Sequence, residues 1–235
     1  MKRKIIVPIN NNVFNKPIKQ AVISVLESDV TVDVENIPQG RRCIESRYDS
    51  IINAPYVAEL AKKSEADGFD GIFVSDMDFC GVEAIREIVS IPVIGGFRAS
   101  AYTAMMLGQK FSIITVLDSV FDMQQEHTRT FCIAENLASI RVVNLPVIAL
   151  VDGHKEEAIE KVFSESINAI ERDGARAIIL GCTGFVGVAQ AVQSRLAKAG
   201  KGVPVIDPNC LAVSYLTLLI RNKLSQSRLT YFFQS

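Results

Sequence analysis

Short apolar runs alternate along the chain with longer stretches in which apolar residues recur at helical spacing. The short runs are rich in β-branched residues and end at turn-forming residues, so they predict strands at 5–9, 30–34, 71–74, 92–94, 111–116, 141–144, 177–180 and 203–206. The longer stretches predict helices at 53–66, 81–89, 99–108, 120–137, 154–173, 185–198 and 209–225. Strands that are continuous apolar runs are buried on both faces, and alternation with helices indicates an α/β fold with a largely parallel sheet.

An internal repeat relates the two parts of the chain. Residues 68–76 align with residues 174–182: each segment is a glycine turn, a buried strand, and then a reactive side chain, Asp76 or Cys182. The offset is 106 positions at both ends, from 68 to 174 and from 76 to 182. Ligands of open α/β sheets bind outside the carboxyl ends of the strands. The sequence therefore predicts two similar parallel-sheet α/β halves, related by pseudo-two-fold symmetry, with the active site in the cleft between them.

Composition and charge exclude several classes of protein. The 235 residues fit one large domain or two ordinary ones, and we expect a first α/β domain of residues 1–95 and 207–235 and a second of residues 96–206. The formal net charge of −1 offers no field for nucleic acid or a membrane surface. The longest apolar stretch, 210–220, contains Ser214 and Thr217 and is too short to span a bilayer. We therefore expect neither a nucleic-acid nor a membrane partner.

The cysteines and histidines argue against metal and disulfide chemistry. Five cysteines are scattered without CxxC spacing, which argues against a disulfide framework or a structural zinc site and favours a reducing, cytoplasmic setting. His127 and His154 are too far apart for metal-ligand spacing, and His127 is expected on a solvated helix face. No nucleotide-binding motif is present. We expect neither a metal nor a cofactor.

Cys182 is the strongest candidate for a reactive group. It lies in Leu180-Gly-Cys-Thr-Gly184, between a predicted strand and a helix expected to begin near Phe185. Backbone N–H groups at such a turn bind anions, and the positive end of a helix favours a thiolate. A free cysteine is often only a small buried hydrophobe, which suits Cys132 and Cys210 better than Cys182.

These motifs, taken in order, resemble the aspartate/glutamate/hydantoin racemase superfamily, most closely its hydantoin racemase branch. Residues 9–12 are similar to the family's Ile-Asn-Pro-Asn, with Asn11 where proline is usual. Residues 43–49, Cys-Ile-Glu-Ser-Arg-Tyr-Asp, are similar to its Ser-Ile-Glu-Ser-x-Tyr-Asp segment. Residues 81–94 resemble the segment after the first catalytic residue, and Leu180-Gly-Cys-Thr-Gly184 resembles the second catalytic motif. In this family two cysteines move a proton on opposite faces of the acidic carbon, without a cofactor.

The resemblance fails at the first catalytic cysteine. Where the family has Cys-Phe-x-Asp-Pro-Gly, this chain reads Asp76-Met-Asp-Phe-Cys-Gly81, so alignment on Gly81 puts Asp76 at the catalytic position. The repeat gives the same register. Cys80, four residues along, stays open as the alternative, and Asp76 could instead be a turn carboxylate. An ordinary carboxyl has a pKa of about 3.9 and an ordinary thiol a pKa of about 8.5. Such an unequal pair suits one-way proton transfer better than a reaction in which the two groups exchange the roles of acid and base.

Substrate-binding candidates follow from the negative charge that forms on oxygen when a proton leaves a carbon next to a carbonyl. The obvious donors are Thr183 with the backbone through Gly184, and Asn10 or Asn12, of which the resemblance favours Asn12. Arg98 stands where hydantoin racemases tend to have glutamate, and a cation there suits an anionic substrate, although a solvated surface arginine is equally compatible. Tyr48 either lines the site or simply packs.

The first choice of function is a cofactor-independent racemase or epimerase resembling hydantoin racemase. Its substrate would be a small amide or amino-acid derivative with an acidic carbon next to a carbonyl. The alternatives are a cofactor-independent lyase, decarboxylase or one-way isomerase that uses Cys182 as proton donor, and a non-catalytic ligand-binding protein with the racemase fold. The apolar tail 229–233 is expected to dock on a neighbouring subunit, which predicts a homo-oligomer.

Overall fold

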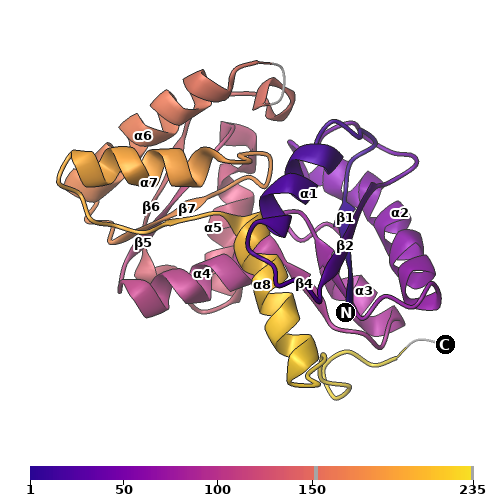
Figure 1. Ribbon diagram of the computed structural model, residues 1–235. Coiled ribbons are helices and arrows are strands. Elements are labelled where there is room, and N and C mark those ends of the chain that lie inside the picture. Colours follow the sequence, from indigo (N-terminus) through magenta and orange to yellow (C-terminus); the bar gives the residue numbers. More distant parts are fainter. Residues whose placement is uncertain (151–152, 234–235) are drawn as a thin grey trace. The chain divides into compact units, whose positions relative to one another are not determined.

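The computed structural model describes residues 1–150 and 153–233, which form two compact units (Figure 1). The first unit comprises Met1–Gly96 and the chain from Asn209 onward, and the second comprises Phe97–Pro208. The chain thus crosses from one unit to the other at the beginning of a helix in both places, α4 (Gly96–Leu107) and α8 (Pro208–Arg221).

The first unit is built on a four-stranded parallel sheet with the order β2-β1-β3-β4. Its strands and helices, α8 aside, are β1 (Lys2–Val7), α1 (Asn15–Ile23), β2 (Thr31–Asn36), α2 (Arg47–Ala66), β3 (Gly71–Val74), α3 (Val82–Ile88) and β4 (Val93–Gly95). The central strands β1 and β3 are buried apart from Lys2, with Ile5, Ile6, Ile72, Phe73 and Val74 fully inaccessible. The continuous apolar runs therefore mark these interior strands, as the sequence predicts.

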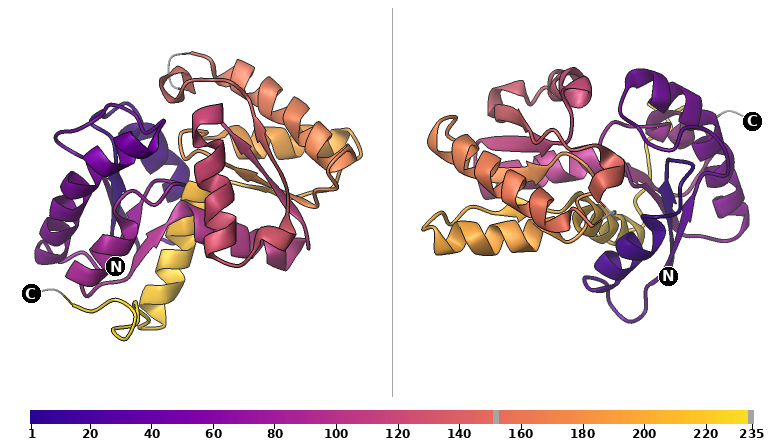
Figure 2. Two further views of the ribbon diagram at one scale, coloured as in Figure 1. Left: turned by 180° about the vertical axis from the view of Figure 1, so that it is seen from behind. Right: turned by 90° about the horizontal axis from the view of Figure 1, so that it is seen from above.

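The second unit repeats this topology with the strand order β6-β5-β7-β8. It contains, after α4, β5 (Phe111–Thr115), α5 (Phe121–Thr130), β6 (Leu137–Val142), α6 (Lys155–Glu171), β7 (Ala177–Leu180), α7 (Val188–Lys198) and β8 (Val205–Ile206). Three short 3₁₀ helices lie at Asp118–Val120, Ala134–Asn136 and Val147–Leu150. Figures 1 and 2 show α6 and α7 side by side along the sheet.

The predicted α/β fold with two similar parallel-sheet halves is therefore correct, and the repeat extends to single hydrogen bonds. Ser75 N–H donates to Ile6 at 2.8 Å, and Gly181 N–H, 106 positions later, donates to Ile114 at 2.8 Å. The next helix of each unit begins after a left-handed glycine at the same offset, Gly81 with φ 73° and Gly187 with φ 72°. Glycine is the residue that adopts this conformation without steric cost.

Several predicted helix boundaries are wrong, each for a local reason. The sequence pattern misses α1, which buries only Ile18 and Val22 and carries Pro17 in its first turn, where proline is tolerated. Helix α2 begins at Arg47, six residues before the expected position, because the hydroxyl of Ser46 accepts the N–H of Asp49 and caps it. Helix α5 ends at Thr130 rather than 137, since Cys132 turns the chain with a φ of 55°.

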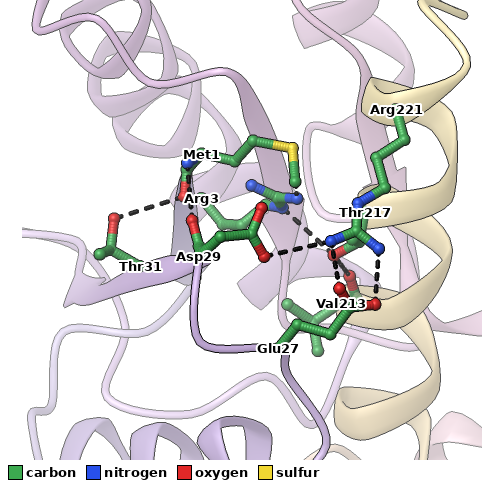
Figure 3. Close-up of polar contacts among 8 residues, drawn as sticks. All are labelled: Met1, Arg3, Glu27, Asp29, Thr31, Val213, Thr217 and Arg221. Atoms are coloured by element: carbon green, nitrogen blue, oxygen red, sulfur yellow. Dashed lines mark hydrogen bonds and ion pairs between the residues drawn. The ribbon is translucent and has the colours of Figure 1, made fainter.

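The segment after Asn209 is fastened to the beginning of the chain within the first unit (Figure 3). Arg3 on β1, which is fully buried, donates from Nε to Thr217 Oγ1 on α8 at 3.2 Å. Arg221 on α8 pairs with Glu27 and, at 3.1 Å, with Asp29. These contacts between distant parts of the sequence stabilise the first unit as a discontinuous domain.

The last described residues fold back on α3 of their own unit. Arg228 donates to the carbonyls of Arg86 and Val89 at 2.8 and 2.6 Å, and Gln226 donates to Val89 and Ile91 at 2.9 and 3.1 Å. Leu229 remains 88% exposed and Phe233 53% exposed. The polar side chains of the tail thus form hydrogen bonds within the first unit. Docking on a neighbouring subunit stays a prediction for the exposed apolar residues of the tail.

Among residues 1–150 and 153–233, no helix has the length and apolar character needed to span a bilayer.

Candidate active site

The turn after β7 places the Cys182 thiol next to a backbone donor. The side chain of Cys182 is half-buried, and the N–H of Gly184 points at its Sγ with an N–S distance of 3.3 Å. Helix α7 begins only at Val188, so the expected helix start near Phe185 is three residues too early. A local N–H of the turn, rather than the first turn of α7, therefore donates to this thiol.

Gly181, the residue before Cys182, lies where no side chain fits. A Cβ atom at this position would be 2.7 Å from Ile113 Cγ2 and 2.9 Å from both Gln124 Oε1 and Thr115 Cβ. Gln124 donates from Nε2 to the Gly181 carbonyl at 2.7 Å. Close packing thus determines the course of the backbone that leads into Cys182.

The turn after β3 holds Asp76 at the equivalent position of the first unit. Asp76 is 8% exposed, and its Oδ2 accepts the N–H of Cys80 at 2.8 Å. Its backbone carbonyl accepts the N–H of Gly96 at 2.9 Å. Asp76 therefore also helps to shape its own turn, where Phe79 has a left-handed φ of 61°.

Cys80, the alternative acid or base, is a poor candidate by environment. Its side chain is 2% exposed, and its Sγ donates to the backbone carbonyl of Ser50 at 3.4 Å. Burial raises the pKa of the Cys80 thiol far above its ordinary range, and the nearby carboxylate of Asp76 raises it further. A thiol whose pKa is raised in this way is disfavoured as a base at neutral pH.

The three asparagines after β1 differ from one another in burial and bonding. Asn10 is half-buried and its N–H donates to the Arg41 carbonyl at 2.8 Å, whereas Asn12 is exposed. Asn11 is 9% exposed, and its Oδ1 accepts the N–H of Val13 at 3.1 Å. Its Nδ2 is buried and has no hydrogen-bond partner among the described residues. Asn11 is thus a donor that the sequence pattern missed, and its only signal was the replacement of the usual proline.

The loop after β2 is tied to the asparagine loop through Asn53 of α2. This fully buried amide donates to the carbonyls of Pro8 and Arg41 at 2.8 and 3.2 Å and accepts the Arg41 N–H at 2.7 Å. Asp49 accepts from Arg41 Nε at 2.8 Å and from the Ser46 hydroxyl at 2.7 Å. The matched motif at 43–49 therefore anchors this loop. Tyr48 is 63% exposed, so it does not pack in the core.

Arg98 is held against an aromatic side chain of its own unit. It lies in the first turn of α4, half-buried, with its guanidinium carbon 4.7 Å from the centroid of the Phe131 ring. His127 makes an edge-on contact with Phe97, with ring centroids 5.2 Å apart. The expectation of a solvated His127 is therefore wrong, because this face of α5 packs on the beginning of α4.

The predicted site residues thus fall into two groups. The first unit contributes Asn10, Asn12, Tyr48 and Asp76, and the second contributes Arg98, Cys182, Thr183 and Gly184. Within residues 1–150 and 153–233, no cluster of three or more His, Cys, Asp or Glu side chains could hold a metal ion. The cysteines at 43, 80, 132, 182 and 210 are all free thiols.

Comparison with known proteins finds related sequences and structures along nearly the whole chain. The family described as Asp/Glu/Hydantoin racemase matches residues 11–216. A hydantoin racemase of Pseudomonas sp. (strain NS671) is 31% identical over 94% of this chain and 86% of its own length. A hydantoin racemase of Paenarthrobacter aurescens is 28% identical over 88% of this chain and 86% of its own length. The solved structure of an allantoin racemase from Klebsiella pneumoniae has a TM-score of 0.93 and 29% identity, and the match covers 100% of this chain and 94% of that one.

Proposed function

We propose that this chain, which belongs to the Asp/Glu/hydantoin racemase family and is a racemase, interconverts the enantiomers of a small cyclic ureide of the hydantoin type. The names of its relatives, hydantoin racemase and allantoin racemase, support this substrate class. In a hydantoin, the hydrogen on the substituted ring carbon is acidic because it lies next to a carbonyl. The reaction removes this hydrogen from one face and returns a proton to the other.

One observation carries the assignment of the acid and base. Asp76 and Cys182 occupy equivalent turns of the two units, each two positions beyond the end of the corresponding strand. Each follows a residue whose N–H makes the same hydrogen bond to the neighbouring strand. Inversion at carbon needs two proton-transfer groups on opposite faces of that carbon, and the proposal assigns one such group to each unit.

The proton balance of the proposed reaction is simple. For one enantiomer, the Asp76 carboxylate removes the hydrogen, the electron pair moves to the carbonyl oxygen, and the Cys182 thiol protonates the opposite face. For the other enantiomer, the Cys182 thiolate is the base and the Asp76 carboxylic acid is the donor. The free enzyme returns to its starting protonation state by exchange with water. The Gly184 N–H at Sγ stabilises the thiolate in both directions.

Other residues in this proposal bind the substrate and its developing charge. Thr183 and the backbone through Gly184, together with Asn10, Asn12 and the buried amide of Asn11, supply hydrogen-bond donors for the ring and the enolate oxygen. Arg98, oriented by Phe131, favours a substrate whose side group is anionic. No step of the proposed reaction requires a metal or an organic cofactor.

The unequal pair of a carboxyl and a thiol supports a second candidate. If only Cys182 returns a proton, the same residues suit a lyase that protonates the enolate left by decarboxylation of a malonate-like acid. This reading keeps Cys182 as the proton donor and removes the need for Asp76 to act as an acid.

Racemisation of a single enantiomer tests the proposal. Purified protein treated with a metal chelator is incubated with one enantiomer of a 5-substituted hydantoin. The circular dichroism signal of the substrate is measured over time, since it falls to zero as the substrate becomes racemic. We expect decay with wild-type protein and none with Cys182→Ala, since the acid or base is lost with little change in volume. Decay by the variant within tenfold of wild type would remove Cys182 from the mechanism.

A further inference from the structure

We propose that Gln124, which lies outside the matched motifs, is a positioning residue that holds the Cys182 thiol in its reactive place. This inference rests on the proposed role of Cys182. Gln124 is on α5, is fully buried, and belongs to the same unit as Cys182. It acts through the peptide that joins Gly181 to Cys182.

Both sides of Gly181 are fixed by hydrogen bonds. Its N–H donates to Ile114 on β5 at 2.8 Å, and its carbonyl accepts from Gln124 Nε2 at 2.7 Å. Thr115 Oγ1 is a weaker second donor to this carbonyl at 3.5 Å. The carbonyl of Gly181 belongs to the same planar peptide as the N–H of Cys182. Its orientation therefore determines how the backbone enters the Cys182 turn.

The amide of Gln124 can serve this carbonyl in only one orientation. Gln124 Oε1 is buried and has no hydrogen-bond partner among the described residues, whereas Nε2 donates to the Gly181 carbonyl. Rotation of the amide by half a turn would set its oxygen against the Gly181 oxygen, and two acceptors repel. A buried oxygen without a donor costs free energy of folding. A position that keeps this cost is one where the side chain has a role beyond stability, here the orientation of the Gly181 carbonyl.

The absence of a side chain at Gly181 makes the arrangement tight. Gln124 Oε1 would be 2.9 Å from a Cβ atom there, so the amide packs directly on the backbone before Cys182. The equivalent position of the first unit is Ser75, which uses its own hydroxyl to bond Asn209 Oδ1 at 2.7 Å. The two units thus support their equivalent turns by different means, and the support of Cys182 depends on Gln124.

The reactivity of the thiol provides a readout that needs no substrate. The tryptic segment 177–195 contains Cys182 and no other cysteine, so mass spectrometry of this segment reports the rate at which iodoacetamide labels Cys182 in native protein. Gln124→Met keeps the length and removes the donor, and Gln124→Leu removes the donor with little change in volume. The matched controls are Gln125→Met and Gln125→Leu, since Gln125 is half-buried on the same helix and accepts from Arg129 at 3.3 Å.

We expect both Gln124 variants to label Cys182 about tenfold more slowly than wild type and to lower kcat by a similar factor, while KM changes little. The Gln125 variants should match wild type in both measurements. If Gln124→Met does not fold, Thr115→Val tests the same carbonyl through its weaker donor and should give a smaller loss of the same kind. Wild-type labelling and kcat in a folded Gln124→Met or Gln124→Leu variant would overturn the proposal. If Cys182→Ala retains wild-type turnover, the proposed function fails instead, and the labelling rates still decide the role of Gln124.

Discussion

Asp76 and Cys182 lie 106 positions apart in the sequence and at the same point of two units with the same strand order. Ser75 and Gly181, the residues before them, each donate an N–H to the adjacent strand at 2.8 Å. The duplication therefore presents a carboxyl and a thiol from the same structural position. That equivalence supports the proposal that Asp76 is a proton-transfer group and not only a turn carboxylate.

Cys80 should be chemically silent in the native protein. Because burial and the Asp76 carboxylate raise the pKa of its thiol, iodoacetamide should not label Cys80 in native protein at pH 8, and should label it once denaturant unfolds the chain. Cys80→Ala should keep kcat within about threefold of wild type and cost roughly 1 kcal/mol of the free energy of unfolding. Rapid native labelling of Cys80, together with loss of turnover in Cys80→Ala, would make Cys80 the acid or base in place of Asp76.

The buried amide of Asn11 should matter more to turnover than the exposed amide of Asn12. Asn11→Asp keeps the oxygen that accepts the Val13 N–H and removes the buried donor. If that donor binds the enolate oxygen, kcat should fall by roughly 10²-fold, as for other oxyanion donors. Asn12→Asp is the matched variant. A large loss in Asn12→Asp and none in Asn11→Asp would return the role to the residue that the family motif favours.

Asp49 should make the first unit sensitive to acid. Burial alone would raise the pKa of this carboxyl, but hydrogen bonds from Ser46, Arg41 and the Glu45 N–H outweigh burial and hold the pKa below its ordinary value. A lowered pKa stabilises the folded state above the unfolded-state pKa of about 3.9, and this contribution is lost as pH falls through the lower folded-state pKa. The difference in unfolding free energy between wild type and Asp49→Asn should therefore be largest near neutral pH and shrink below roughly pH 4. Glu59→Gln, at an exposed position, is the control, and a pH-independent difference for Asp49→Asn would contradict the assignment.

Arg228 should stabilise the first unit through α3. Its guanidinium satisfies the carbonyls of Arg86 and Val89 where this helix ends, so Arg228→Ala should lower the free energy of unfolding by about 1–3 kcal/mol. Leu229→Ala, one residue along and 88% exposed, should change it by less than about 0.5 kcal/mol. Urea denaturation measures both. If Arg228→Ala lowers the free energy of unfolding as little as Leu229→Ala does, the contacts of Arg228 with α3 do not stabilise the unit.

The α/β class, the repeat and the candidate Cys182 could be predicted from the sequence because each has a local pattern. Buried parallel strands are continuous apolar runs, and a glycine-flanked cysteine after such a strand is visible in any alignment of the two halves. Helix α1 could not be predicted in this way, since it buries few side chains and begins at Asn15, shortly after a run of asparagines.

The residues that support the candidate site could not be predicted from the sequence, for a different reason. Gln124 bonds a carbonyl 57 positions away, and Asn53 bonds one 45 positions away, so neither contact leaves a periodic or local trace. The environment of Cys80 is likewise a tertiary property, because its thiol meets the backbone of Ser50 on α2. The sequence thus shows which side chains are chemically able to react, whereas their environments follow from tertiary contacts.

Solvent deuterium exchange tests the central claim, that Asp76 and Cys182 are the two proton-transfer groups, most directly. Each enantiomer of a 5-substituted hydantoin is incubated in deuterated water with wild type, Asp76→Asn and Cys182→Ala, and deuterium at the acidic carbon is measured before racemisation is complete. Wild type should label both enantiomers. Asp76→Asn should label only the enantiomer whose hydrogen faces Cys182, and Cys182→Ala should label only the other one. Labelling of both enantiomers by Asp76→Asn at the wild-type rate, or labelling of the same single enantiomer by both variants, would contradict the account.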